Sequence, residues 1–489
     1  MPTKPSTTVK SGASFVKSSA STDKSGAPLV VKTTTASVAE LAKDTSQSAP
    51  LTDKKSKSIT SLRGFKDVLP DEQGYWDKIE SVVKSVASAY GFGKIRLPIA
   101  EATPLFERGV GKETDIVGKE MFTFLDQGNT RMTLRPEGTA PAVRAYIEHG
   151  MLNQPQPVKL WYLEQFFRHE RPQAGRYRQF WQAGFEVIGS NDPVLDAQLI
   201  VLGVGIFKQL GIEVSTQLNS IGMPAERRQY ITDLTKYFKS HSKKLGELDL
   251  KRLAKNPLRI LDSKEPAVVE LKKDAPNIIS YLDPESKAHF MKVIEYLDAA
   301  EIQYNLDSSL VRGLDYYTRT VFEFMVPNPI EGEAPITLGG GGRYDGLVEL
   351  LGGRANTPGV GLAIGIERLI LAVKQAKSIP ASELEQPVDV FFCQLGEAAR
   401  RQGLKIFEKL RASGLNLGEA FSKGSLKAQL ETADKLRSPF ALILGQKEVL
   451  DGTIILRDMD AGAQEILDVE KIQSVVTKRL HDLKTRSAK

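Results

Sequence analysis

The sequence of 489 residues predicts an α+β protein that carries a separate α/β domain at its C-terminal end. Two aromatic-rich segments, 160–168 and 179–188, are strand-like and are joined by a polar loop, a pattern typical of an antiparallel pair. Helix-like segments dominate from about 224 to 301, and after residue 388 strand-like and helix-like segments alternate. Because the chain is too long for one core, we expect two or three domains.

The first 58 residues are a Ser/Thr/Lys-rich segment without a sustained apolar period, so we expect a disordered tail. The tail has nine lysines and four acidic residues, a net charge of +5, which leaves +1 of the total +6 for the rest of the chain. A solvated tail and a targeting or nucleic-acid-binding arm are both compatible with this composition. A mitochondrial transit peptide is rich in arginine and poor in acids, and this tail has the opposite pattern.

Residues 59–380 are expected to form the first folded domain. In it the spacing predicts a helix over 73–90, strands over 95–99 and 321–326, and an apolar helix over 365–374. The helix-like stretch interrupts the strand pattern, which indicates an inserted helical domain at about 222–305.

Residues 387–489 are expected to form the α/β domain, after a linker that contains Pro380 and Pro387. Its predicted strands are 388–393, 440–444 and 453–457, and its predicted helices are 398–412, 425–437 and 469–484. Cys393 ends an apolar strand, and we interpret it as a buried hydrophobic residue rather than a nucleophile.

The composition excludes several kinds of protein and site. The chain has no run of about 18 uninterrupted apolar residues, so we expect no membrane span. A single cysteine excludes disulfides and thiolate metal sites, and the five histidines never fall at a metal-ligand spacing. We therefore expect no metal bound by histidine or cysteine.

Four segments combine an arginine with unusual flanking residues, and any one alone would be read as a surface ion pair. The chain has no P-loop, and the glycines at 359, 361 and 365 do not have the spacing of a dinucleotide fingerprint. Activation of a carboxylic acid by ATP brings two anions together, which fixed arginines and Mg²⁺ can stabilise. The four segments are 133–139 (TLRPEGT), 167–172 (FRHERP), 310–317 (LVRGLDYY) and 365–369 (GIERL).

Taken together and in this order, these segments resemble those of class II aminoacyl-tRNA synthetases. Residues 167–172 resemble the second signature of that class and 359–369 the third, while 96–98 (RLP) stand where the first signature places its proline, at the dimer interface. Residues 310–323 and 341–346 (GGRYDG) resemble segments specific to histidyl-tRNA synthetases. The resemblance runs from about residue 64 to the C-terminus.

The resemblance implies a fold and a reaction. The fold would be a class II antiparallel-sheet catalytic domain with a helical insertion, followed by a C-terminal anticodon-binding domain. The reaction would be the ATP- and Mg²⁺-dependent ligation of L-histidine to tRNA(His) through a histidyl-adenylate, releasing pyrophosphate and AMP. A cytoplasmic homodimer is implied as well.

The resemblance also assigns roles at the phosphates. Arg168 would contact the α-phosphate and Arg368 the γ-phosphate of ATP, while Arg176 lies in a loop that covers ATP. Arg312 would bridge the histidine carboxylate and the α-phosphate, which makes Arg312 and Arg168 the catalytic residues.

Histidine itself would be bound by a second group of residues. Glu137 would pair with its amino group, supported by Thr139. A neutral imidazole has one donor and one acceptor, which a carboxylate and a tyrosine hydroxyl can satisfy. Gln182 and Glu186 share one face of their predicted strand, although such an alternation also fits an ordinary strand with a solvated face. The residues implied around the imidazole are Gln182, Glu186, Tyr316, Tyr317 and Tyr344.

Arg171 and Gln173, in the loop between the paired strands, are implied to contact the tRNA acceptor end. A solvated turn is the alternative for this loop. A catalytically inactive paralogue, the regulatory subunit of ATP phosphoribosyltransferase, is the alternative for the whole chain. Such chains usually lack the C-terminal domain and catalytic arginines, which this sequence retains. Tyr316 and Tyr317 argue against a proline or threonine enzyme.

Deletion of residues 1–58 should leave aminoacylation of tRNA largely unchanged, because the predicted site residues all lie in the folded part. The measurement is the rate of aminoacylation by the full-length and truncated chains at matched salt. A large loss on truncation would mean that the tail binds substrate.

Overall fold

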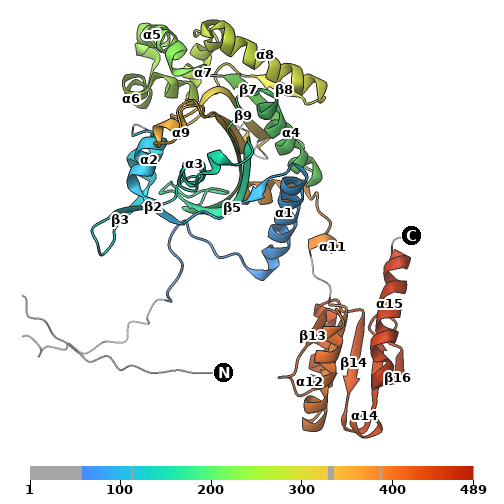
Figure 1. Ribbon diagram of the computed structural model, residues 1–489. Helices are drawn as coiled ribbons and strands as arrows, with labels where there is room; N and C mark the ends of the chain where they lie inside the picture. The colour runs from blue at the N-terminus through green and yellow to red at the C-terminus, as the bar shows by residue number, and fades with distance from the viewer. Residues whose placement is uncertain (1–57, 113, 329–334, 385–387, 488–489) are drawn as a thin grey trace, which may run out of the picture. The chain divides into compact units, whose positions relative to one another are not determined.

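The computed structural model describes residues 58–112, 114–328, 335–384 and 388–487 (Figure 1). The chain divides into two units, Met1–Thr60 and Ser61–Lys489. Of the first unit only residues 58–60 are described, and they are exposed and form neither helix nor strand. The predicted disordered tail therefore lies almost entirely outside the described residues and stays a prediction.

An eight-stranded, mostly antiparallel sheet forms the centre of the second unit up to residue 384. Its order is β1-β5-β6-β11-β10-β9-β7-β8. The two edge strands are parallel to their neighbours, β1 to β5 and β8 to β7, and the other described pairs are antiparallel. The antiparallel pair β5–β6 confirms the pair expected from the sequence. The bounds are β1 (Gly93–Lys94), β5 (Val158–Phe167), β6 (Gln179–Ile188), β11 (Gly359–Gly365), β10 (Ile336–Arg343), β9 (Thr318–Val326), β7 (Ser215–Ser220) and β8 (Tyr304–Leu306).

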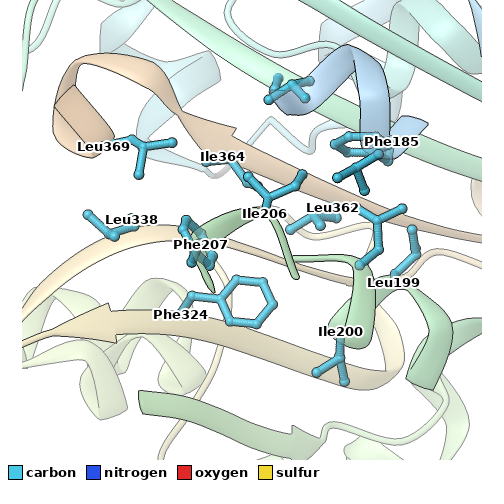
Figure 2. Close-up of a cluster of buried hydrophobic side chains, with 14 of the residues drawn as sticks. Phe185, Leu199, Ile200, Ile206, Phe207, Phe324, Leu338, Leu362, Ile364 and Leu369 are labelled. Carbon is cyan, nitrogen blue, oxygen red and sulfur yellow. The ribbon is translucent and has the colours of Figure 1, made fainter. Parts of the chain in front are cut away.

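The outer face of this sheet is covered by α1 (Pro70–Ala89), α4 (Val194–Gln209) and α10 (Ile366–Ala376). Phe185 and Phe324 project from β6 and β9 into a buried apolar cluster with residues of α4 (Figure 2). The rings of Phe207 and Phe324 lie 5.2 Å apart in an edge-on contact. Because side chains alternate across a strand, this packing directs Gln182 and Glu186 of β6 to the opposite face.

On the inner face the sheet curves around α3 (Thr139–Glu148) (Figure 1). A second, three-stranded sheet has the order β2-β4-β3 and consists of β2 (Ala100–Ala102), β3 (Phe122–Leu125) and β4 (Arg131–Leu134). The short helices nearby are α2 (Thr103–Gly109), the π-helix Ile116–Glu120, the 3₁₀ turn Met151–Asn153 and α9 (Leu347–Leu350). The concave face enclosed in this way contains the candidate site.

The segment between β7 and β8 is helical. Tyr230, Leu234 and Phe238 are buried on one side of its first helix, at the 3.6-residue spacing that a helix needs to form a core. Its helices are α5 (Pro224–Ser240), α6 (Glu247–Lys255), α7 (Pro266–Lys272) and α8 (Pro284–Ala299), with 3₁₀ turns at Ser242–Lys244, Pro257–Asp262 and Ile278–Tyr281.

The predicted strand over 95–99 is wrong. Those residues lie between β1 in the large sheet and β2 in the small one, and Pro98 has no N–H to give to a ladder. The carbonyls of Leu97 and Pro98 instead accept hydrogen bonds from the buried guanidinium of Arg135, the latter at 3.2 Å. The Arg135 side chain therefore supplies the hydrogen-bond donors that a neighbouring strand would have given to these two carbonyls.

The last hundred residues form an α/β domain around a five-stranded sheet of order β13-β12-β14-β15-β16. Apolar clusters lie on both of its faces. Cys393 is fully buried in one of them, where burial raises the pKa of its thiol to about 12, which agrees with its interpretation as a hydrophobic residue. The elements are β12 (Val390–Gln394), α12 (Glu397–Ala412), β13 (Leu417–Glu419), α13 (Leu426–Lys435), β14 (Phe440–Leu444), α14 (Gln446–Asp451), β15 (Thr453–Asp458), β16 (Gln464–Asp468) and α15 (Ile472–Ser487).

A short helix, α11 (Ala381–Leu384), precedes the undescribed linker. Across the described ranges, no helix combines the length and the apolar character needed to cross a membrane.

The substitution Phe324→Ala should lower the free energy of unfolding by about 3–5 kcal/mol, because it opens a cavity between the sheet and α4. All three tryptophans lie in α1, β5 and β6, so tryptophan fluorescence during urea denaturation reports on this part of the chain. Leu306→Ala, at a side chain that is 55% exposed in β8 of the same sheet, is the control and should change stability by less than about 0.5 kcal/mol. Equal losses in the two variants would contradict the assigned core.

Candidate active site

A cavity of about 500 Å³ opens on the concave face of the large sheet. Its floor is formed by β6, β9, β10 and β11, and its walls by α3, the loop 311–317 and the loop 175–177. The 3₁₀ turn Pro257–Asp262 also reaches the cavity, with Arg259 and Asp262. A volume of this size is that of a small-molecule site.

The glycine run 339–342 forms part of the floor as strand β10 rather than as a loop. A Cβ on Gly341 would lie 1.9 Å from the carbonyl oxygen of Gly361 in β11, and a Cβ on Gly340 would lie 2.9 Å from a guanidinium nitrogen of Arg312. These residues therefore have no room for side chains, and Arg312 rests directly on the strand.

Glu186 is a buried carboxyl group, only 1% exposed, that lies behind the cavity-lining residues Thr139, Tyr162 and Tyr344. One oxygen accepts hydrogen bonds from Thr139 at 2.9 Å and Tyr162 at 3.1 Å, and the other accepts one from Tyr344 at 2.7 Å. Burial raises the pKa of Glu186 to about 8, although the three hydroxyl donors favour the ionised form. The interpretation of Glu186 as a solvated surface residue is therefore wrong.

Glu137 is a second buried carboxylate, at the N-terminus of α3. It accepts the backbone N–H groups of Thr139 at 2.8 Å and Ala140 at 3.0 Å, which the first turn of a helix leaves without partners. The hydroxyl of Tyr316 lies 3.4 Å away. Burial raises the pKa of Glu137, while the two N–H groups and Arg168 act in the opposite direction.

Arg312 lines the cavity, paired with Glu323 of β9 and with its guanidinium 5.7 Å from the centre of the Tyr317 ring. Burial lowers the pKa of the Arg312 guanidinium, but Glu323 and the Tyr317 hydroxyl more than reverse that effect, so the pKa is raised overall. Arg312 is therefore a permanent cation held at a fixed point.

The other end of the cavity is rich in arginine. Arg168 donates to the carbonyl of Pro136 at 2.8 Å, and Arg368 donates to the carbonyl of Thr337 at 2.7 Å. Glu170 lies 3.8 Å from Arg168 and 3.6 Å from Arg176, distances that give weak ion pairs. Burial lowers the pKa of Arg368, and the neighbouring cations Arg176 and Arg168 lower it further. This concentration of positive charge suits a polyanion.

Most of the predicted site residues meet in this cavity, and Glu186 lies behind its wall in contact with Thr139 and Tyr344. Arg171 and Gln173 do not line it. Gln173 forms a tight backbone bridge with Arg176, whereas Arg171 lines a separate open hollow with Arg63, His169 and Arg178. The predicted residues that line the cavity are Glu137, Thr139, Arg168, Arg176, Gln182, Arg312, Tyr316, Tyr317, Tyr344 and Arg368.

Several further cavity residues were given no role from the sequence, among them Tyr162, Glu323, Arg259 and Asp262. Tyr162 is opposite Gly184 in the β5–β6 register, and its ring fills the space that a side chain at 184 would need. An aromatic residue opposite a glycine in the predicted strand pair could have indicated from the sequence that the Tyr162 ring lies over Gly184. Arg259 pairs with Asp262 at 3.3 Å, a local i,i+3 contact, and with Asp115 at 2.7 Å, a distant contact for which the sequence gives no local signal.

Within the described ranges, no group of three or more His, Cys, Asp or Glu residues could hold a metal ion. In the cavity, the carboxylates Glu170 and Glu323 both face arginines. A Mg²⁺ ion with one or two carboxylate ligands and substrate phosphates would still fit this donor set.

Comparison with known proteins identifies the family. The family model described as histidyl-tRNA synthetase matches residues 64–369, well over half of the chain. The chain belongs to the histidyl-tRNA synthetase family. A second model, described as an anticodon binding domain, matches residues 389–479, the α/β domain that begins at β12. Together they confirm the predicted fold class.

Solved structures described as histidyl-tRNA synthetases are similar to this chain. The enzyme from S. aureus is 36% identical, with a TM-score of 0.71, over 86% of this chain and 100% of that chain. The enzyme from a Nostoc species is 22% identical, with a TM-score of 0.60, over 86% of this chain and all of that chain. A Bacillus halodurans protein described as an ATP phosphoribosyltransferase regulatory subunit/histidyl-tRNA synthetase is 21% identical over 80% of this chain and 98% of that chain, with a TM-score of 0.57. The last two show a shared fold.

The substitution Glu186→Gln should stabilise the free protein at alkaline pH. The folded protein holds a proton on Glu186 up to pH about 8, whereas the ordinary pKa is 4.5, so the stability that this group contributes falls as pH rises between those values. Glutamine stays neutral, and the variant's advantage in melting temperature should grow from about pH 5 to about pH 9.

Glu148→Gln, at a side chain that is 60% exposed, is the matched control and should melt like the parent protein at every pH. A Glu186→Gln advantage that does not change with pH would contradict the raised pKa. Activity should fall at the same time, because the carboxyl group that accepts hydrogen bonds from Thr139, Tyr162 and Tyr344 is lost.

Proposed function

We propose that the chain is a histidine–tRNA ligase that forms histidyl-adenylate from L-histidine and ATP and then transfers histidine to tRNA(His). One observation carries the proposal: Arg312 connects an end of the cavity with buried carboxyl and hydroxyl groups, through its contact with Tyr317, to an end with three arginines. The second connection runs through Glu323 and Thr337, whose carbonyl accepts a hydrogen bond from Arg368. An amino acid and a nucleoside triphosphate bound at these two ends would meet at the Arg312 guanidinium.

The carboxyl end suits histidine. Glu137, held by two backbone N–H groups, offers an anion for the α-ammonium group, and Thr139 contacts both Glu137 and Glu186. The Tyr344 and Tyr162 hydroxyls and Glu186 provide donors and acceptors for both nitrogens of an imidazole, with Gln182, Tyr316 and Tyr317 nearby. An amino acid without such a ring would leave these buried groups unpaired, which is the physical basis for rejecting it.

The arginine end suits the phosphates. Arg168 and Arg368 would hold the α- and γ-phosphates, and Arg176 would cover them. In the first step a histidine carboxylate oxygen attacks the α-phosphorus and the bond to pyrophosphate breaks, so negative charge gathers beside Arg312. In the second step a ribose hydroxyl of tRNA attacks the acyl carbon and AMP leaves. Mg²⁺, held mainly by the phosphates with Glu170 or Glu323, would neutralise the leaving pyrophosphate.

We assign residues 59–380, with the insertion 222–305, to catalysis and residues 387–489 to anticodon binding. Arg171 and Gln173 are candidates for contacts with the acceptor end. The hollow that Arg171 lines has three arginines, Arg63, Arg171 and Arg178, against one acid, Glu170, so it suits RNA phosphates. A homodimer through the region of residues 96–98 and a cytoplasmic location complete the proposal.

Pyrophosphate exchange into ATP, measured with each of the twenty amino acids in turn, tests the proposal directly. We expect exchange with histidine alone. Exchange driven by another amino acid would overturn the specificity, and the absence of any exchange would favour the regulatory-subunit alternative over a ligase.

The substitution Arg312→Ala should reduce histidine-dependent exchange by about 1,000-fold or more, because it removes the cation at the reacting phosphate. Circular dichroism and the melting temperature should remain close to those of the parent protein. Arg131→Ala, which removes an arginine that is 58% exposed and lies in β4, is the control and should keep full exchange. Substantial exchange by Arg312→Ala would contradict the assigned role.

A further inference from the structure

A fully buried ion pair lies behind the wall of the cavity. Asp196 in the first turn of α4 and Arg343 at the end of β10 are both 0% exposed, and Oδ1 of Asp196 accepts a hydrogen bond from Nη1 of Arg343 at 2.7 Å. Burial would raise the pKa of Asp196, yet Arg343 and His289 together hold it below its ordinary value. Such a pair contributes little to stability compared with apolar packing, so its retention needs another explanation.

Arg343 uses its remaining donors on the chain that surrounds it. Nη2 donates to the carbonyl of Ser190 at 2.7 Å, and Nε donates to Asp345 at 3.2 Å. Asp345 in turn accepts the backbone N–H of Gly359 at 3.3 Å. The guanidinium therefore connects the loop before α4 to the residues on both sides of position 344.

Tyr344 is the residue between these two fixed neighbours. Its backbone N–H donates to the carbonyl of Gly359 at 2.8 Å, and its hydroxyl donates to Glu186 at 2.7 Å. A Cβ on Gly359 would lie 2.2 Å from the tyrosine ring, so the ring passes directly over that backbone. Arg343 is the last residue of β10 and Tyr344 follows it directly, so the contacts that hold Arg343 also restrict the backbone from which the Tyr344 side chain projects.

The second oxygen of Asp196 extends the network to the helical segment. It faces Nε2 of His289 in α8 at 2.8 Å, and His289 is 7% exposed. Nδ1 of the same ring lies 3.4 Å from Arg319, which also pairs with Glu285 of α8 at 2.5 Å. Asp196 is thus held from two sides, by Arg343 of the sheet and by His289 of α8.

We propose that Arg343 is a positioning residue for Tyr344. In this proposal Asp196, which is held by His289 of α8, keeps the Arg343 guanidinium in position. This inference rests on the proposed function, in which Tyr344 and Glu186 bind the imidazole. Loss of the network should loosen Tyr344 and weaken the binding of histidine, whereas the arginines at the phosphate end have no contact with it.

The test is the Michaelis constant for histidine and, separately, for ATP in the pyrophosphate exchange reaction. Asp196→Asn keeps the shape of the side chain but removes its charge and turns an amide towards Arg343 or His289. We expect the KM for histidine to rise about tenfold, a modest effect for displaced binding groups, and the KM for ATP to change by less than about twofold. His289→Ala should act in the same direction, and His289→Gln, which can still donate to Asp196, should restore part of the loss.

Asp249→Asn is the matched control, because Asp249 is 1% exposed, pairs with Arg252 at 3.1 Å within α6 and does not line the cavity. It should leave both Michaelis constants unchanged. An unchanged KM for histidine in folded Asp196→Asn, or an equal rise for histidine and ATP, would overturn the proposal. Failure of Asp196→Asn and both His289 variants to fold would overturn it too, because the network would then be structural only. If the parent protein shows no histidine-dependent exchange, it is the proposed function that fails.

Discussion

Burying the guanidinium of Arg312 costs free energy unless its charge is matched, and the site is arranged around that match. Glu323 supplies the counter-charge from β9, and the Tyr317 ring covers one side. Glu323 balances the charge of Arg312 in the free protein, and Arg168, Arg176 and Arg368 add positive charge for a ligand at one end. At the other end, backbone N–H groups and hydroxyls donate to the carboxyl groups of Glu137 and Glu186. One end of the cavity is therefore rich in positive charge and the other in carboxyl groups.

The hydroxyl donors around Glu186 illustrate how such a group can be buried. Thr139, Tyr162 and Tyr344 come from α3, β5 and the segment after β10, so three separate parts of the chain converge on one side chain. Each donor is neutral, and together they satisfy both oxygens without adding a cation. An apolar wall would have excluded the carboxylate, and a cation would have neutralised it.

The sequence predicted what depends on local patterns, and missed what depends on long-range contacts. The alternation in 179–188 gave β6 with its bounds, because one face of that strand packs on α4. The predicted strand over 95–99 does not form, because the carbonyls of Leu97 and Pro98 accept hydrogen bonds from Arg135, which is distant in sequence. Arg259 and Asp262 reach the cavity from the helical segment, which no local periodicity could indicate. The residues named by family resemblance were found because their motifs are contiguous.

The glycine run of β10 also bears on how this protein can change over evolutionary time. The cavity floor at Gly339 and Gly340 is peptide backbone, and a new side chain there would collide with Ala363 and Ile364 or with Phe322 and Arg312. The groups that the floor presents to a ligand are thus nearly immune to single substitutions that leave the fold intact. Drift in substrate preference has to come through cavity positions that carry a side chain, such as Gln182 of β6, which can be exchanged one at a time.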